Sequence, residues 1–287
     1  MKIKQNTILW VATMIVAGSY ADTFVADLGL TFQNISSDSN PSSGIGQVGY
    51  DYGIGTYEIT RSQWGAFVAD GGPVGSGAGY AEESNTSGDR PVGYTSWNEA
   101  AQFVNWLNIN SGYAPAYKFD ESGVVGLWDE DDQSEASAYR HKDTVYVLPS
   151  NDEWVKAAYW NGTELQESSM PDNDLDHTDA KYEPDYGSTW EVGSGTQEIN
   201  GTYDMAGNVW EWTDTAGSEG DDMIIRGGAY FNPGTMLLST DEGLESSRTL
   251  ESSGVGFRVV VIPEPASIML LGLFGGGVWF FRRIFIR

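Results

Sequence analysis

The segment "NGTYDMAGNVWEW" (residues 200–212) is the most informative stretch of this 287-residue chain. Gly207 and Asn208 indicate a tight turn, because both residue types tolerate the left-handed backbone that such turns need. Trp210 and Trp212 follow directly, and we expect both large rings to anchor a hydrophobic core. The segment therefore predicts a turn that leads straight into the buried interior.

Three short helices are predicted by one shared device, a Ser or Thr followed three residues later by Glu or Gln. In this capping box the two side chains satisfy each other's backbone N–H groups at the start of a helix. Apolar side chains at helical spacing follow each box. The three boxes are Thr60 with Gln63, Ser96 with Glu99, and Ser150 with Glu153.

The segment between residues 22 and 262 contains no repeat of fixed period and no long linker. Short runs of β-forming residues alternate there with the predicted helices, and the rest is Gly-, Asp- and Ser-rich connection. This pattern predicts one α+β domain with unusually long loops. The expected strands are Gly53–Ile59, Val145–Leu148, Ile224–Arg226 and Phe257–Ile262.

Composition excludes several function classes. The chain has 15 Lys and Arg against 41 Asp and Glu, a formal net charge of −26. It therefore lacks the basic surface that nucleic-acid binding requires, and we expect no nucleic-acid partner. There is no cysteine, which removes disulfides, thiolate metal sites and cysteine nucleophiles. Aromatic residues make up 13% of the chain, too many for a disordered acidic protein.

The N-terminus has the layout of a secretory signal peptide. Two lysines precede an apolar run over residues 8–17, and Ser19 and Ala21 supply small side chains at the −3 and −1 positions of a cleavage site. The run is too short to span a bilayer. We therefore predict a signal peptide over residues 1–21.

The C-terminus is a second targeting segment, covering residues 263–287. It begins with Pro-Glu-Pro, continues with the apolar stretch Ala266–Phe281 and ends with three arginines. This layout resembles the PEP-CTERM sorting signal, which implies export, transient inner-membrane contact through a short transmembrane stretch, and processing by an exosortase-type enzyme. The mature protein would then lie in the cell envelope or outside the cell. An ordinary C-terminal membrane anchor is the alternative.

The body of the chain, roughly residues 44–262, resembles the formylglycine-generating-enzyme (sulfatase-modifying-factor) family. That resemblance implies a C-type-lectin-like α+β fold with little regular secondary structure. The elements that carry it are "IGTYEITRSQWGAFV" (54–68), "PVGYTSWNEAAQFVNWLN" (91–108), "YVLPSNDEWVKAAYWNG" (146–162), "NGTYDMAGNVWEW" (200–212), "RGGAYF" (226–231) and "GFRVV" (256–260).

The family's best-known activity uses a pair of cysteines that bind copper, and its sulfoxide-forming relatives use a cluster of histidines. Without cysteine, formylglycine generation is excluded and we expect no copper. His141 and His177 stand alone in the sequence, and a lone histidine is usually a satisfied or surface residue. We therefore assign no catalytic residue.

The resemblance implies a calcium site within residues 204–211. Its ligands would be the Asp204 side chain, the carbonyl oxygens of Gly207 and Val209, and the Glu211 side chain, a set of hard oxygen donors that suits calcium. The alternative is that Glu211 forms a salt bridge with Arg226 or Arg258. The family's second calcium site is in doubt here, since Lys181 replaces the asparagine that relatives commonly carry.

Two groups of side chains could bind a ligand. A polar cluster would support an enzyme of altered mechanism acting on exported proteins; it comprises Arg226, Asn232, Ser239, Arg248 and Arg258. Aromatic residues in polar stretches could stack on sugar rings, although ordinary packing explains them too; they are Trp128, Tyr186, Trp190 and Tyr230. The acidic run from Asp172 to Glu183 is interpreted as a solvated loop.

Together these features predict an exported, non-catalytic module at the cell surface or in the extracellular matrix. It would bind extracellular polysaccharide or an envelope protein on a calcium-stabilised scaffold. The alternatives are an enzyme of altered mechanism in the same fold and a purely structural matrix component.

Overall fold

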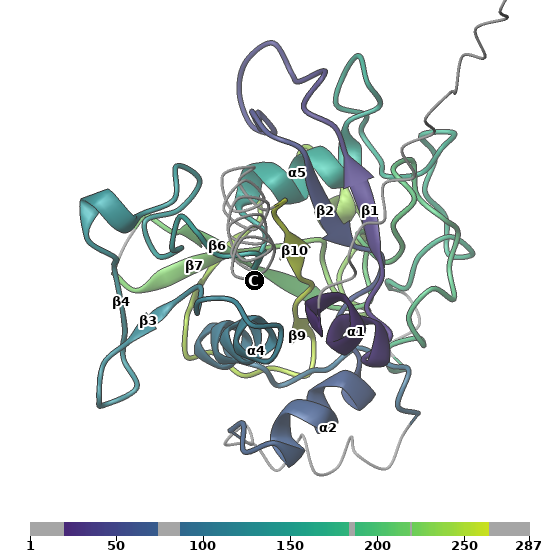
Figure 1. Cartoon of the computed structure of the whole chain (residues 1–287). Coiled ribbons are helices and arrows are strands. Elements are labelled where there is room, and N and C mark those ends of the chain that lie inside the picture. The colour runs from purple at the N-terminus through teal and green to yellow at the C-terminus, as the bar shows by residue number, and fades with distance from the viewer. Residues whose placement is uncertain (1–19, 74–86, 184–186, 219, 264–287) are drawn as a thin grey trace, which may run out of the picture.

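The computed structural model describes residues 20–73, 87–183, 187–218 and 220–263. Short helices and strands alternate with long loops, so the predicted α+β class is confirmed (Figure 1). The helices are α1 (Tyr20–Asp27), α2 (Arg61–Ala69), α4 (Trp97–Asn110) and α5 (Asn151–Tyr159), with 3₁₀ turns η1 (Glu130–Asp132) and η2 (Gly234–Leu237). The strands are β1 (Phe32–Ile35), β2 (Tyr52–Gly55), β3 (Lys118–Phe119), β4 (Val125–Gly126), β5 (Tyr146–Val147), β6 (Trp210–Ala216), β7 (Asp222–Arg226), β8 (Leu244–Ser247), β9 (Val255–Gly256) and β10 (Val260–Val261).

Most of both predicted targeting segments lies outside the described residues. The signal peptide is covered only at positions 20 and 21, which belong to α1, and the C-terminal tail only at residue 263. Among the residues that are described, every helix is too short or too polar to cross a bilayer.

Two four-stranded sheets form the framework. The first has the order β1-β2-β10-β5 and is antiparallel throughout, with Val260 of β10 opposite Ile54 on one side and Val147 on the other. The second has the order β8-β7-β6-β9, and β6 runs parallel to β9. A separate β3–β4 pair completes the described strands. The last described strand therefore sits inside the first sheet rather than at its edge.

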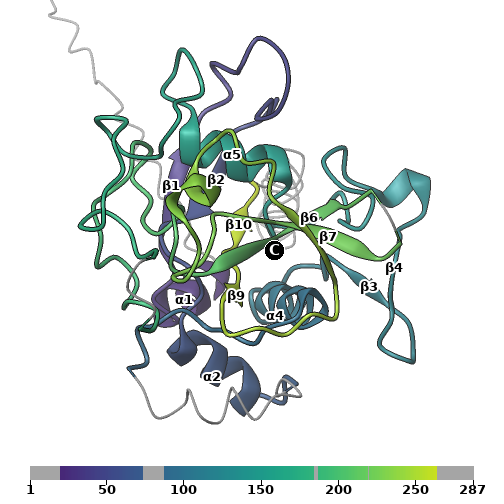
Figure 2. The same ribbon diagram turned by 180° about the vertical axis from the view of Figure 1, so that it is seen from behind.

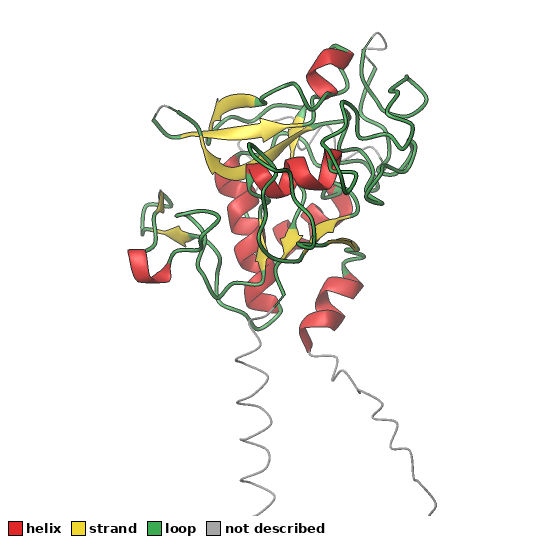
Figure 3. Ribbon diagram, turned by 90° about the horizontal axis from the view of Figure 1, so that it is seen from above, coloured by secondary structure: helices red, strands yellow, loops and turns green. Residues whose placement is uncertain are grey.

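The helices and loops take distinct places around these sheets. In Figures 1 and 2, α5 lies above and α4 below the level of β10. The long loops between residues 161 and 205 gather on one flank, and the β3–β4 pair lies on the opposite flank. Figure 3 shows how much of the molecule is loop. The loop-rich flank is thus carried by a compact framework.

All three predicted capping boxes are confirmed. The side chain at each N-cap accepts a hydrogen bond from the N–H three residues later, and the Gln or Glu there accepts one from the cap N–H. In α4, for example, the Ser96 N–H donates to Glu99 over 2.9 Å. Each helix therefore begins where its local sequence directs.

Five tryptophans lie in the main core cluster, and three of their indole N–H groups donate the hydrogen bonds given below. Trp97 donates to the Thr213 carbonyl and Trp212 to the Thr95 carbonyl, each over 2.8 Å. Trp154 donates to the Glu211 carboxylate over 2.8 Å. Trp210 and Trp212 are both buried, which confirms them as core anchors. These bonds let large rings pack without leaving an unpaired donor.

The strand predictions are correct in place but not in extent. The segment Phe257–Ile262 forms a strand only at Val260–Val261; before it, the Phe257 and Val259 carbonyls accept isolated hydrogen bonds from the Ile59 and Gly55 N–H groups. β6 was not predicted as a strand. Its first five residues are buried on both faces, so the period-2 pattern is missing.

A buried ion network joins α5 to β6. Arg140 donates to Asp214 over 2.9 Å and to both oxygens of Glu153 over 3.1 and 3.0 Å. Tyr117 adds a hydrogen bond to Asp214 over 3.1 Å, while the second Asp214 oxygen is buried without a partner. One guanidinium thus faces two carboxylates, and burial raises the pKa of Asp214 from 3.8 to about 6.

This arrangement predicts a pH dependence of stability. Since the folded pKa of Asp214 exceeds its unfolded value, its contribution is fully present below pH 3.8 and is lost as the pH rises through about 6. In Asp214→Asn, the fall in unfolding free energy between pH 4.5 and 7.5 should be smaller than in the wild type, by up to about 2 kcal/mol. Urea titrations at both pH values measure it, and identical falls would contradict the assignment.

Candidate functional site

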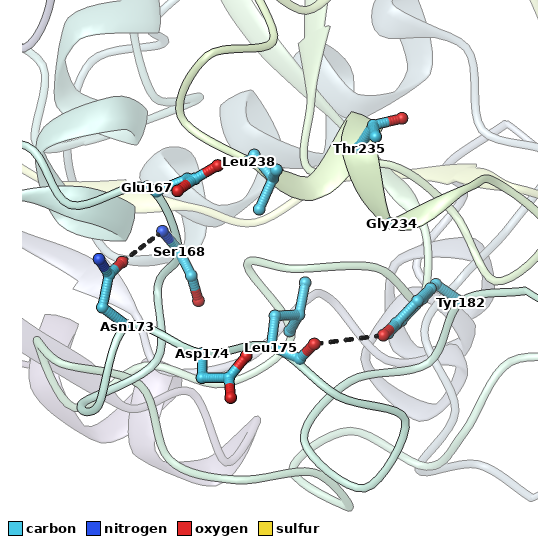
Figure 4. Close-up of a pocket in the computed structure, with 9 residues that line it drawn as sticks. All are labelled: Glu167, Ser168, Asn173, Asp174, Leu175, Tyr182, Gly234, Thr235 and Leu238. Atoms are coloured by element: carbon cyan, nitrogen blue, oxygen red, sulfur yellow. Dashed lines mark hydrogen bonds between the residues drawn. The ribbon is translucent and has the colours of Figure 1, made fainter.

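A pocket of about 310 Å³ opens between the loop at residues 167–182 and η2 (Figure 4). It belongs to the loop-rich flank, and its two walls come from segments more than fifty residues apart in the sequence. The lining residues are Glu167, Ser168, Asn173, Asp174, Leu175, Tyr182, Gly234, Thr235 and Leu238.

The loop wall is shaped by local hydrogen bonds. The Ser168 N–H donates to the Asn173 side chain over 2.8 Å, and the Met170 N–H donates to the Ser168 hydroxyl over 3.0 Å. Asn173 adopts a left-handed backbone conformation with φ of 59°, which asparagine tolerates better than most residues. The chain therefore doubles back and exposes residues 173–175 to the pocket.

The opposite wall is fixed by a small second core. Leu237 of η2 is fully buried there, together with Met170, Ala180 and Ala206. The Ser239 N–H donates to the Glu167 carbonyl over 2.8 Å and so ties the two walls together. The pocket is therefore supported from beneath by apolar packing.

The lining is acidic and partly apolar. Glu167 and Asp174 supply exposed carboxylates, Leu175 and Leu238 come from opposite walls, and the Tyr182 hydroxyl donates to the Leu175 carbonyl over 3.4 Å (Figure 4). No lining residue carries a positive charge. The pocket therefore suits a ligand that has a cationic group beside an apolar one.

The five residues of the predicted polar cluster do not line this pocket, and the three arginines have separate partners. Arg226 is buried and donates to the Asn151 side chain over 2.6 Å. Arg248 pairs with the exposed Asp221 over 3.0 Å, and Arg258 is bound in the core. The Asn232 side chain accepts a hydrogen bond from the Ala229 N–H. Ser239 lies just after η2, and its N–H donates to the Glu167 carbonyl.

The predicted calcium ligands lie at the end of a loop that enters β6. One Asp204 oxygen accepts from the Gly193 N–H over 2.7 Å, while the other is buried without a partner. Glu211 instead pairs with Arg258 through two hydrogen bonds of 2.6 Å and accepts the Trp154 indole N–H. The alternative salt bridge between Glu211 and Arg258 is therefore present.

These contacts fit calcium poorly. Both Glu211 oxygens accept hydrogen bonds, so among the two predicted side-chain ligands only Asp204 has an oxygen without a partner. Across the described ranges, no cluster of three or more Asp, Glu, His or Cys side chains is placed to hold a metal ion. Calcium binding at this loop stays a prediction, and a cation there would compete with Arg258 for Glu211.

Glu58 is the residue of this region that the sequence did not single out. Its buried carboxylate accepts from the Asn208 side chain over 2.6 Å and from the Val209 N–H over 3.1 Å. Burial, and then the nearby Asp204 and Glu211, hold its pKa well above the usual range. The feature of the sequence that could have pointed to Glu58 is a single acidic residue within the β-forming segment "TYEIT" (56–60). Glu58 thus fixes the turn that precedes β6.

Known proteins share this architecture. A family model for the sulfatase-modifying factor enzyme 1-like domain matches residues 14–262. The chaperone protein LppX of Paenibacillus barcinonensis is 27% identical over 186 residues, which span 56% of this chain and 61% of LppX. The chain therefore matches less than two thirds of that relative.

Solved structures agree. Treponema denticola variable protein 1 superposes with a TM-score of 0.62 at 24% identity, over 82% of this chain and 95% of that one. CarF superposes with a TM-score of 0.61 at 22% identity, over 82% and 98%. At such identities the likeness extends to the fold alone.

Gly207 offers a direct test of the turn before β6. Its φ is +84°, and an added Cβ would collide with the Lys181 carbonyl oxygen, which also accepts the Asn208 N–H over 2.8 Å. We expect Gly207→Ala to lower the unfolding free energy by at least about 3 kcal/mol, from backbone strain plus the clash.

Gly123 is the matched control, because its φ is +76° but an added Cβ would meet open space. Gly123→Ala should lower the unfolding free energy by only about 1–2 kcal/mol. Chemical denaturation measures both variants. Equal losses of unfolding free energy in the two variants would show that the backbone at Lys181 moves to accommodate the added Cβ. The close contact at Gly207 would then not require glycine.

The buried ion pair is tested against an exposed one. Arg258→Met leaves Glu211 buried and unpaired, and should lower the unfolding free energy by about 3–5 kcal/mol. Lys142→Met removes the Lys142–Asp132 pair, whose side chains are 44% and 45% exposed, and should change it by less than about 1 kcal/mol. Adding Glu211→Gln to Arg258→Met should recover part of the loss. Similar losses of unfolding free energy in the two single variants would refute the expected difference between the buried and the exposed ion pair.

Proposed function

The chain belongs to the family of sulfatase-modifying factor enzyme 1-like domains, and on that basis we propose that it is an exported, non-catalytic binding module of this family. The predicted signal peptide and C-terminal sorting tail support export to the cell envelope or beyond, with processing by an exosortase-type enzyme. Family membership also confirms the predicted fold.

A binding role is supported by the absence of the residues on which the family's best-known chemistry depends. It contains no cysteine, so the cysteine and copper chemistry that the resemblance implies is not open to it. The arginines that would support an altered mechanism are committed to Asn151, Asp221 and Glu211. An enzyme of altered mechanism remains the alternative proposal.

The acidic pocket carries the proposal. Two exposed carboxylates beside two leucines and a tyrosine match a peptide segment in which lysine or arginine adjoins an apolar residue. The net charge of −26 would attract such a segment from a distance. LppX, the relative described above, is named a chaperone protein, which favours another polypeptide as the partner.

We therefore propose a segment of an exported or envelope protein as the ligand of this pocket. Polysaccharide is the second class of partner, favoured by the partly exposed Trp190 outside the pocket. Calcium would at most stabilise the scaffold, because Glu211 is held by Arg258.

The test is peptide binding by the full-length protein with and without the pocket charges. We expect a fluorescent peptide rich in lysine and leucine to bind, and the double variant Glu167→Gln/Asp174→Asn to weaken binding about tenfold, equal to about 1.4 kcal/mol. Raising the salt concentration should weaken the wild type more than the variant. Fluorescence anisotropy measures both effects.

The control is Glu130→Gln/Asp131→Asn, which removes the same charge from exposed positions in η1 on the opposite flank. It should change the affinity less than twofold. Equally weakened peptide binding in both double variants would show that net charge alone causes the effect, and would contradict the assignment of the peptide to this pocket. A covalently altered peptide in the mass spectrum would instead favour the enzyme.

A further inference from the structure

A second pocket, of about 300 Å³, has a different lining. Its residues are Arg90, Trp190, Glu191 and Ser194, none of which lines the acidic pocket. The two sites can therefore be altered independently. This second pocket combines an aromatic ring, a cation, a carboxylate and a hydroxyl group within a small volume.

The backbone around Trp190 is fixed to the framework at three points. The Trp190 N–H donates to the Asn208 side chain over 2.8 Å, and the Val192 N–H donates to the Asp89 carbonyl over 2.9 Å. The Gly193 N–H donates to the Asp204 carboxylate over 2.7 Å. A ring on such a segment is pre-positioned, so a ligand loses less conformational entropy when it stacks there.

The polar groups of the pocket supply both donors and acceptors. One Arg90 nitrogen donates to the Ser188 hydroxyl over 3.0 Å; within the described parts of the chain, no carboxylate lies within ion-pair distance of it. Arg90 therefore retains N–H donors for a ligand. Glu191 and Ser194 are both exposed. The Ser194 hydroxyl donates to the backbone carbonyl of Glu191 over 2.6 Å and not to its side chain, so the Glu191 carboxylate is available as an acceptor.

We propose that this pocket binds a pyranose residue of a neutral polysaccharide. Such a ring has an apolar C–H face that can stack on Trp190. Its hydroxyl groups both donate and accept hydrogen bonds, which matches the Arg90 guanidinium and the Glu191 carboxylate in the pocket lining. A pocket of about 300 Å³ is at the small end of ligand sites, so it suits one sugar residue.

The charge of the molecule selects neutral over acidic sugars. Glu191 lines the pocket, and the chain as a whole carries a net charge of −26. A polyanionic glycan would meet repulsion on approach, whereas a neutral one would not. The inference rests on the proposed binding function, for which it specifies the polysaccharide class of partner, and it does not depend on the peptide pocket.

The experiment is binding of the full-length protein to an array of immobilised neutral and acidic oligosaccharides. We expect binding to neutral glycans, about tenfold weaker for Trp190→Ala and several-fold weaker for Arg90→Gln. The control is Trp106→Ala. Trp106 is also a partly exposed tryptophan, its indole N–H donates to the Asp70 carboxylate over 2.8 Å, and it lines neither pocket.

Trp106→Ala should bind within twofold of the wild type, and all variants should keep the lysine–leucine peptide affinity if the protein remains folded. Loss of peptide affinity together with sugar binding would indicate unfolding, and Trp190→Phe, which keeps a ring, should then restore both. Three results would overturn the proposal: no binding to any glycan, equal losses for Trp106→Ala and Trp190→Ala, or binding to acidic glycans alone.

Discussion

The ion pair between Arg258 and Glu211 holds the framework together. Both side chains are fully buried, and charges removed from water stabilise a fold only when their remaining hydrogen-bonding groups are also satisfied. Here they are: Arg258 also donates to the Gly55 and Tyr203 carbonyls over 2.9 Å each, and Glu211 accepts the Trp154 indole N–H. One contact thereby links the end of β2, the loop before β6, β6 itself and α5.

The loops that carry the two pockets depend on this centre. The turn before β6 is held by Glu58 and by the carbonyl of Lys181, and its Asp204 and Asn208 side chains in turn hold the segment around Trp190. Long loops that lack regular hydrogen bonding can keep a defined shape when their backbone is tied to a rigid base. Side chains on the loop-rich flank can therefore differ without disturbing the framework, as expected of a fold that hosts many functions.

Sequence reasoning succeeded wherever the determining contacts are local. The capping boxes at Thr60, Ser96 and Ser150 join residues three positions apart, so each helix start could be predicted. It failed where distant segments meet. The acidic pocket joins residues 167–182 to η2, and locally this stretch shows only the composition of a solvated loop. For Glu211 both partners could be proposed. Arg226 lies directly opposite it across the β6–β7 pair, and only the three-dimensional arrangement shows that the ion pair is made with Arg258.

The position of β10 has a consequence for synthesis. This strand is the last described one, yet it lies between β2 and β5, with Val260 directly opposite Ile54. A ribosome that adds roughly 5–20 residues per second makes these partners about 10–40 s apart. During that interval β2 presents an unpaired edge, and the sheet cannot close while the C-terminal region is still being translated. The nascent chain is thus kept from completing this sheet until Val260 and Val261 have been made, more than two hundred residues after β2.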